Sequence, residues 1–372
     1  MRALAVAVVA WSSSVLAGPL PEGTQVVLED SSLVFVDHGT RVPLFDPRTR
    51  SSELAYTKLI SASLSSDGTI VVQTENCLMD HDELRRTAVL DHARARAENL
   101  RGMQLHLAKK FTDAIPHFAS AAKLDPGTPM YATNLLSAQS MAKLLDDADK
   151  TLATAGTSAP VWFAWRLAVD SDLANLRGRA STKPFTSAKR TKLAYAALGD
   201  VVAASPAGYF AFPEYHGYGM GPTAEDLAVF DANGRELVRV PVIADVDACI
   251  EAPEAPVIDF KCTKAQRAHT AANRRAADEL LASGGFAAQP IQWVDAPDQD
   301  KPVVSPDKKI TVKQVDDKLV IARGSATRTV DGVNEVRRVG FSASAVIVEF
   351  HVMHGCGGAE NSGSSTIVLA VP

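Results

Sequence analysis

A repeated spacing of small and bulky residues in a helical region constrains the fold of this chain most. Between about Asp82 and Arg177, β-forming residues are scarce and Ala, Leu, Lys, Arg and Glu dominate. Six markers in this region and the residues 34 positions later are Gly102 and Leu136, Leu105 and Gln139, Ala114 and Ala148, Phe118 and Leu152, Ala121 and Ala155, and Pro126 and Pro160. Four of the six pairs keep their physical character, which predicts repeated helical hairpins.

The residue types explain how such a hairpin would pack. Small residues at 102, 114 and 121 would let two antiparallel helices approach closely, and Leu105 and Phe118 would fill the space between them. Pro126 and Pro160 fall at helix boundaries. Pro116 falls early in the predicted helix 112–124, where the first turn has no intrahelical donor to lose. A generic bundle of α-hairpins is the alternative interpretation.

This pattern resembles the tetratricopeptide repeat (TPR) family over roughly residues 82–177, closely at 95–128 and less closely at 129–162. The resemblance implies a short array of helical hairpins. We expect a helix over 82–96 to cap one end of the array, and a helix from Ala159 that contains Trp162 and Trp165 to cap the other. Because so few repeats rarely stand alone, we expect the array to lean on the β-rich part of the chain.

In that family the inner faces of the first helices line a binding groove. Carried over to this chain, the candidate binding residues are Asn99, Met103, His106, Leu107, Met130, Thr133, Asn134, Ser137 and Met141. The set is nearly uncharged and rich in methionine, so an apolar or amphipathic segment of a protein or peptide partner suits it better than an acidic tail. The alternative is that these side chains pack against the β-rich part.

Strand-like runs lie on both sides of the helical region. The sequence predicts an N-terminal β-rich segment at 18–80, a TPR-like helical domain at 81–180, and a C-terminal β-rich domain at 190–372 with one helix at about 263–283. Asn233-Gly234 predicts a hairpin. The fold class is therefore α+β, a short TPR-like α-hairpin array combined with antiparallel β-rich domains.

Two further expectations concern the strands. The N-terminal strands could pair with the C-terminal sheet, which would make the helical part an insertion. The turns in SLSSDGT and VVSPDKK resemble turns of β-propeller blades, although the strands are too few for a full propeller.

The first residues and the cysteines point to export. Residues 1–17 read as a signal peptide with cleavage after Ala17, so we expect a periplasmic or secreted protein. In an oxidising compartment, Cys77, Cys249, Cys262 and Cys356 predict disulfides rather than a metal site. We favour Cys249–Cys262 with Cys77–Cys356, while three connectivities remain open. No other apolar run is long enough to span a membrane.

Motifs for chemistry are weak throughout. His351, His354 and Cys356 are closely spaced, but on a strand residues 351 and 354 point to opposite faces, so no metal site is predicted. Asp80 and Asp82 read as an acidic helix start. The glycine-rich stretch Tyr215–Pro222 lacks the residues of a phosphate-binding loop.

Hydrolase motifs and cofactor motifs are also missing from the sequence, and the net charge of −5 argues against nucleic-acid binding. The sequence therefore predicts binding rather than catalysis, by a protein-binding or assembly factor of the bacterial cell envelope. Two alternatives stay open. One is a structural envelope protein whose β domain binds the partner, and the other is a ligand sensor or enzyme that uses the Tyr215–Pro222 loop.

Overall fold

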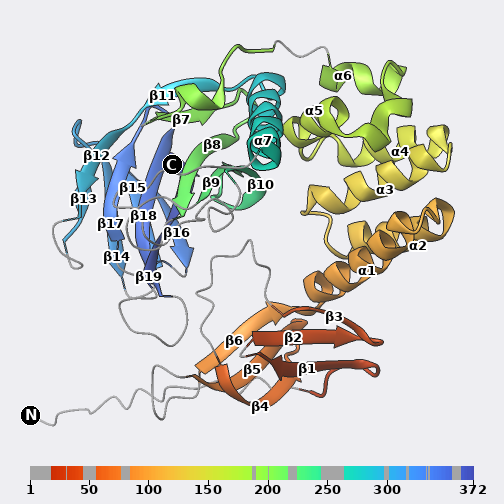
Figure 1. Cartoon of the computed structure of the whole chain (residues 1–372). Helices are drawn as coiled ribbons and strands as arrows, with labels where there is room; N and C mark the ends of the chain where they lie inside the picture. The colour runs from red at the N-terminus through yellow and green to blue at the C-terminus, as the bar shows by residue number, and fades with distance from the viewer. Residues whose placement is uncertain are drawn as a thin grey trace, which may run out of the picture.

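The chain follows the order β, α, β in a computed structural model (Figure 1), and antiparallel sheets and helices form separate runs. The α+β class is thus confirmed. The structure describes residues 18–30, 32–44, 56–76, 84–186, 190–199, 201–216, 224–243, 264–296, 301–315, 318–331, 333, 336–353 and 362–372. The predicted signal peptide, all four cysteines and the pair Asp80 and Asp82 lie outside these residues.

Two three-stranded antiparallel sheets form the N-terminal unit. One contains β1 (Thr24–Glu29), β2 (Ser32–Asp37) and β3 (Thr40–Pro43), and the other β4 (Tyr56–Leu64), β5 (Thr69–Asn76) and β6 (Leu84–Val89). Their shared core is formed by Phe35, Ile70 and Val72 among others. Each of these strands pairs within its own sheet, so the expectation that they join the C-terminal sheet is wrong.

The helices follow directly. They are α1 (Leu90–Leu107), α2 (Phe111–Leu124), α3 (Pro129–Met141), α4 (Leu145–Ala155) and α5 (Pro160–Val169), followed by the 3₁₀ helix η1 (Ser171–Leu176). Short turns η2 (Ala180–Thr182), α6 (Lys183–Thr186) and η3 (Tyr195–Ala197) lead into the C-terminal strands. The predicted helix 82–96 is wrong in its first part, because residues 84–89 pair along β5 and the helix begins at Leu90.

Helix α1 belongs to two cores. Leu90, Ala93 and Ala97 are buried in the core of the N-terminal sheets. Farther along, Gly102 is buried against Phe118 of α2. The same helix therefore joins the N-terminal unit to the helical hairpins.

The turns between paired helices reproduce the 34-residue spacing in their hydrogen bonds. Lys109 and Lys143 both have positive φ angles, of 60° and 64°, as is typical of a left-handed helix cap. The matching backbone donor–acceptor pairs are Ala108–Gln104 and Ala142–Ala138, Lys109–His106 and Lys143–Ser140, Lys110–Leu105 and Leu144–Gln139, and Ala114–Lys110 and Ala148–Leu144. The first two hairpins thus share one backbone geometry at their turns.

Three antiparallel sheets and one long helix form the C-terminal part. The five-stranded sheet has the order β10-β9-β8-β7-β11, with β7 (Val201–Ala204), β8 (Phe210–His216), β9 (Ala224–Phe230), β10 (Glu236–Ile243) and β11 (Ala287–Pro290). Helix α7 (Lys264–Ser283) confirms the predicted helix, and the β9–β10 hairpin confirms the turn at Asn233-Gly234.

Two four-stranded sheets complete it. The second sheet has the order β12-β17-β18-β19, with β12 (Gln292–Asp295), β17 (Val336–Phe341), β18 (Ala345–Met353) and β19 (Ser362–Ala370). The third sheet contains, in order, β13 (Val303–Val304), β14 (Ile310–Val315), β15 (Lys318–Arg323) and β16 (Ala326–Asp331).

These sheets stack as successive layers with the helices. In β9, Leu227 and Val229 join the core shared with α3, α5 and α7, while Ala228 and Phe230 join the core shared with the second sheet. The second sheet alternates in the same way and buries its other face against the third sheet. The order of layers is therefore helices, five-stranded sheet, second sheet, third sheet. One continuous core joins the helical hairpins to the five-stranded sheet.

Three hairpins begin with the same serine turn. The hydroxyl oxygens of Ser65, Ser205 and Ser305 each accept a hydrogen bond from the backbone N–H four residues later, over 3.2, 3.1 and 3.2 Å. The residues in between include Gly68, Gly208 and Lys308, each with a positive φ. Two of these turns are those compared with propeller blades above. That likeness stays a prediction.

Candidate functional site

Two of the predicted binding residues meet on the inner face of the helices. Asn134 of α3 donates from Nδ2 to Oδ1 of Asn99 on α1, over 2.7 Å. Both side chains are half-buried, as are Met103 and Met130 nearby on the same two helices. Met103 contacts the small cluster around Phe118, and Met130 contacts two cores. The pair of amides is the polar centre of this part of the face.

Two others are buried and already satisfied. Thr133 accepts a hydrogen bond from Nε1 of Trp162 over 2.6 Å and donates to the carbonyl oxygen of Pro129. Ser137 donates to Oδ2 of Asp170 over 3.4 Å. Both side chains are almost fully enclosed, because α5 and the residues after it cover this part of α3. They are not available to a partner.

The segment Asp170–Leu176 is the element that covers them. Asp172 reaches His106 on α1, with Oδ2 2.9 Å from Nε2. Asn175 donates to the carbonyl oxygen of Ser140 and accepts from Nζ of Lys143. Leu173 and Leu176 are buried in the main core, so the segment is held firmly. The chain itself thus occupies half of the predicted groove.

Sequence reasoning read these residues as the continuation of a helix. The signal for the break was present in AVDSD, because Asp170 ends α5 and accepts a hydrogen bond from the backbone N–H of Asp172 over 3.0 Å. Aspartate at such a position favours a new turn over continued α-helix. No residue type in the stretch predicts that the new turn folds back onto α3.

Apolar residues remain accessible at one end of the helical hairpins. Leu107 is 75% exposed at the end of α1, and its counterpart 34 residues later, Met141, is half-buried at the end of α3. Leu144 and Val169, after α3 and at the end of α5, are exposed as well. Because α1, α3 and α5 alternate with antiparallel partners, their C-terminal ends lie on the same side. We call Leu107, Met141, Leu144 and Val169 the apolar edge.

Three lysines accompany this edge. Lys109 and Lys110 follow Leu107 in the α1–α2 turn, and Lys143 precedes Leu144 in the α3–α4 turn. Lys109 and Lys143 are the residues with positive φ, so the equivalent turns hold them at equivalent places. Asp146 and Asp149 lie farther along in α4 and pair with Arg179. The edge therefore combines apolar side chains with local positive charge.

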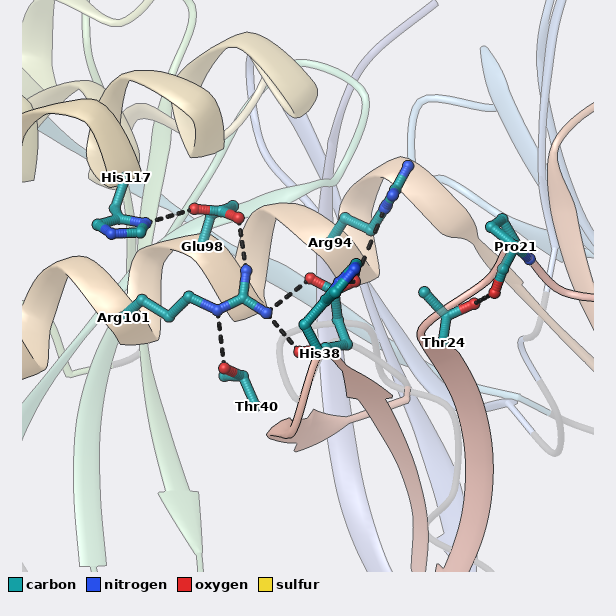
Figure 2. A network of polar contacts seen from close by, with 9 residues as sticks. Pro21, Thr24, His38, Thr40, Arg94, Glu98, Arg101 and His117 are labelled. Carbon is teal, nitrogen blue, oxygen red and sulfur yellow. Dashed lines mark hydrogen bonds and ion pairs between the residues drawn. The ribbon is translucent and has the colours of Figure 1, made fainter.

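A second polar network joins the N-terminal unit to α1 and α2 (Figure 2). Arg101 donates to Oδ2 of the buried Asp37 over 2.8 Å, to the Asp37 carbonyl oxygen, and to the hydroxyl of Thr40 over 2.7 Å. It also pairs with Glu98, which accepts from His117 over 2.7 Å. Burial opposes ionisation of Asp37, but hydrogen bonds from Arg101 and His38 outweigh it and lower the pKa of this carboxyl. This network is a joint rather than a site.

A third cluster lies on the five-stranded sheet. Arg239 contacts Glu214, Asp226 and Glu236 at 2.6, 3.1 and 2.7 Å. Burial disfavours the charged guanidinium, yet the surrounding carboxylates raise the pKa of Arg239 above its usual range. The arrangement is a buried ion cluster whose members neutralise one another, which suits a structural role.

The remaining candidates for chemistry fall largely outside the described residues. This applies to His354, Cys356 and most of Tyr215–Pro222, and to the side chains of Tyr215 and His351, whose backbones lie in β8 and β18. Within the described ranges, no group of three or more His, Cys, Asp or Glu side chains is arranged to hold a metal ion. None of the helices in the described part of the chain is long and apolar enough to cross a membrane.

Comparison with known proteins gives no identification. No family model, no curated protein and no solved structure matches this chain.

Proposed function

We propose that this protein is an exported, non-enzymatic binding or assembly factor of a bacterial cell envelope, and that the apolar edge contacts its partner. The observation that carries the proposal is the exposure of Leu107, three quarters of whose surface is open at the end of a well-packed helix. Large apolar side chains grouped on a protein surface are typical of interaction sites.

The composition of the edge favours one kind of partner. Leu107, Met141 and Leu144 would contact the apolar face of an amphipathic segment. Lys109, Lys110 and Lys143 would contact acidic residues beside that face and raise the association rate. A protein or peptide segment with alternating leucine-like and acidic residues fits this chemistry best.

The resemblance to TPR modules supports the proposal only in part. The shared turn geometry over 34 residues is what repeated hairpins require. Because the segment Asp170–Leu176 occupies half of the inner face, the accessible surface is reduced to the Asn99–Asn134 pair and the apolar edge. The proposed contact surface therefore lies at the end of the helices rather than along the groove.

Affinity capture from the native envelope extract tests this proposal. The mature protein is compared with a Leu107→Glu/Leu144→Glu variant and with Ile60→Glu, a matched control because Ile60 on β4 and Leu144 are 40% and 41% exposed. We expect one partner that the wild type and the control retain and the double variant loses. The dissociation constant of the identified partner should rise at least roughly tenfold, since two apolar contacts of about 1 kcal/mol each are lost.

Circular dichroism must first show that all three proteins are folded. A partner that the double variant retains would contradict the proposed surface. It would move the search to the Asn99–Asn134 pair, for which Met103→Glu/Asn134→Ala is the corresponding variant, and then to the β sheets.

A further inference from the structure

The third C-terminal sheet ends the stack of layers and has one uncovered face. The five-stranded sheet is covered by helices on one side and by the second sheet on the other. The second sheet is covered on both sides by its neighbouring sheets. Of the third sheet, the face that carries Val303, Val312 and Ile321 is buried. The opposite face ends the stack.

The composition of this face differs from that of an ordinary solvated sheet face. Its residues, from the strand register, are Val304, Thr311, Lys313, Val315, Lys318, Val320, Ala322, Thr327 and Thr329. All of them are exposed or half-buried. Seven of these nine are valine, threonine or alanine, and only the two lysines carry charge. We call these nine residues the end face.

The end face is also regular. Strands β14, β15 and β16 pair residue by residue without a register shift, whereas β10 shifts twice against β9. Bulges and inward-pointing charges are the usual means by which a sheet avoids stacking on another. Val304 and Val315, both counted among the exposed large apolar residues, lie toward opposite ends of the face. Such a surface can accept another sheet packed about 10 Å away.

We propose that the end face binds the end face of a second copy of this chain, so that the stack continues through a two-fold axis. This inference does not depend on the proposed function. The occupant follows from the layers already described, because each internal sheet in this chain is covered by a sheet or helix layer of similar extent. An identical face supplies a layer of the same size and the same small β-branched residues.

The size and charge of the face set the strength of this dimer. Four strands with six residues in the longest present a face on the order of 400 Å², about half of what each partner buries in a stable complex. The dimer is therefore weak, with a dissociation constant of roughly 10–100 μM. Two copies of Lys313 repel each other across the interface, so added salt strengthens the association.

Sedimentation velocity of the mature protein between about 1 and 200 μM tests the proposal. We expect a reversible monomer–dimer equilibrium. Val315→Lys should weaken it at least roughly tenfold, while Val89→Lys, a matched control because Val315 and Val89 are 44% and 43% exposed, should leave it unchanged. Lys313→Thr should strengthen it several-fold and remove the salt dependence.

Three outcomes would overturn the inference. The first is a protein that stays monomeric at every concentration, and the second is a dimer that Val315→Lys and Lys313→Thr leave unaltered. The third is a different protein that binds the end face of a chain shown to be monomeric. Thermal melts of the variants identify any loss of folding, which Lys313→Thr avoids because it replaces an exposed side chain with the commonest neighbour on that face.

Discussion

Gly102 of α1 lies directly against the ring of Phe118 of α2, so that a Cβ atom at position 102 would lie 2.6 Å from Phe118 Cε1. This contact sets how closely the first two helices approach. Phe118 is fully buried, and Ala114 and Ala121 on the same helix are also fully enclosed. The first helical hairpin is therefore held by the fit between one glycine and one aromatic ring.

Gly102→Ala is expected to destabilise the protein although alanine is the better helix former. Overpacking of a core costs about 1–3 kcal/mol, and the gain in helix propensity returns at most about 1 kcal/mol. Urea unfolding followed by circular dichroism measures the difference. Gln104→Ala, at an exposed position of the same helix, is the control and should change stability by less than about 0.5 kcal/mol. A Gly102→Ala variant as stable as the wild type would show that the helices can separate without cost.

Gly234 offers a second test of close approach. It has a φ of 81°, and a Cβ there would lie 2.5 Å from Leu369 Cδ2. Gly39 has nearly the same φ, 83°, with nothing within 4 Å. Gly39→Ala should cost about 1 kcal/mol from backbone strain alone, and Gly234→Ala should cost more by the clash, about 1–3 kcal/mol. Equal losses in urea unfolding would assign the whole effect to the backbone.

Asp37 and Arg101 provide a prediction that depends on pH. Because the folded protein lowers the pKa of Asp37, its ionised form stabilises the fold at a pH above the ordinary pKa of the carboxyl. This stabilisation is lost as the pH falls through the lowered value. Asp37→Asn should cost about 3–5 kcal/mol at pH 7, because Arg101 then lacks its buried partner.

The same difference should shrink as both proteins are unfolded at decreasing pH below about 4. Thr40→Ser, which keeps the hydroxyl that Arg101 contacts, is the control for the joint and should retain both stability and pH dependence. A stability difference between Asp37→Asn and wild type that stays constant down to pH 2 would contradict the assigned role.

The segment Asp170–Leu176 should be firmly held rather than exchangeable. Asp170→Ala removes the acceptor for Ser137, Arg166 and the backbone N–H of Asp172. Loss of this cap and ion pair should cost about 1–3 kcal/mol. Hydrogen exchange read by mass spectrometry should then show faster exchange at 171–176 and no change at Ala114–Ala121. Rapid exchange of the segment in the wild type would restore the open groove that the TPR resemblance implies.

Sequence reasoning recovered the elements whose cause is local. The helix at 264–283 and the hairpin at Asn233-Gly234 follow from periodicity and turn chemistry. The small residues 102, 114 and 121 lie at the close contacts that their spacing predicts. Residues 84–89 were assigned to a helix because their composition suits either structure, and only pairing along β5 makes them a strand.

The candidate site was recovered less well for the same reason. Asn99 and Asn134 come together as their spacing suggests. Thr133 and Ser137 do not remain accessible, because Trp162 and Asp170 cover them from a part of the chain about 30 residues away. A single sequence contains no local sign of such a return.

Because α1 contributes its first half to one core and its second half to another, the N-terminal sheets and the helical hairpins share a load-carrying rod. Melting of either neighbour exposes part of that rod and removes support from the other. We therefore expect these two regions to unfold in a single transition, and a pulling force applied at Thr24 to pass to Leu124 without an intermediate.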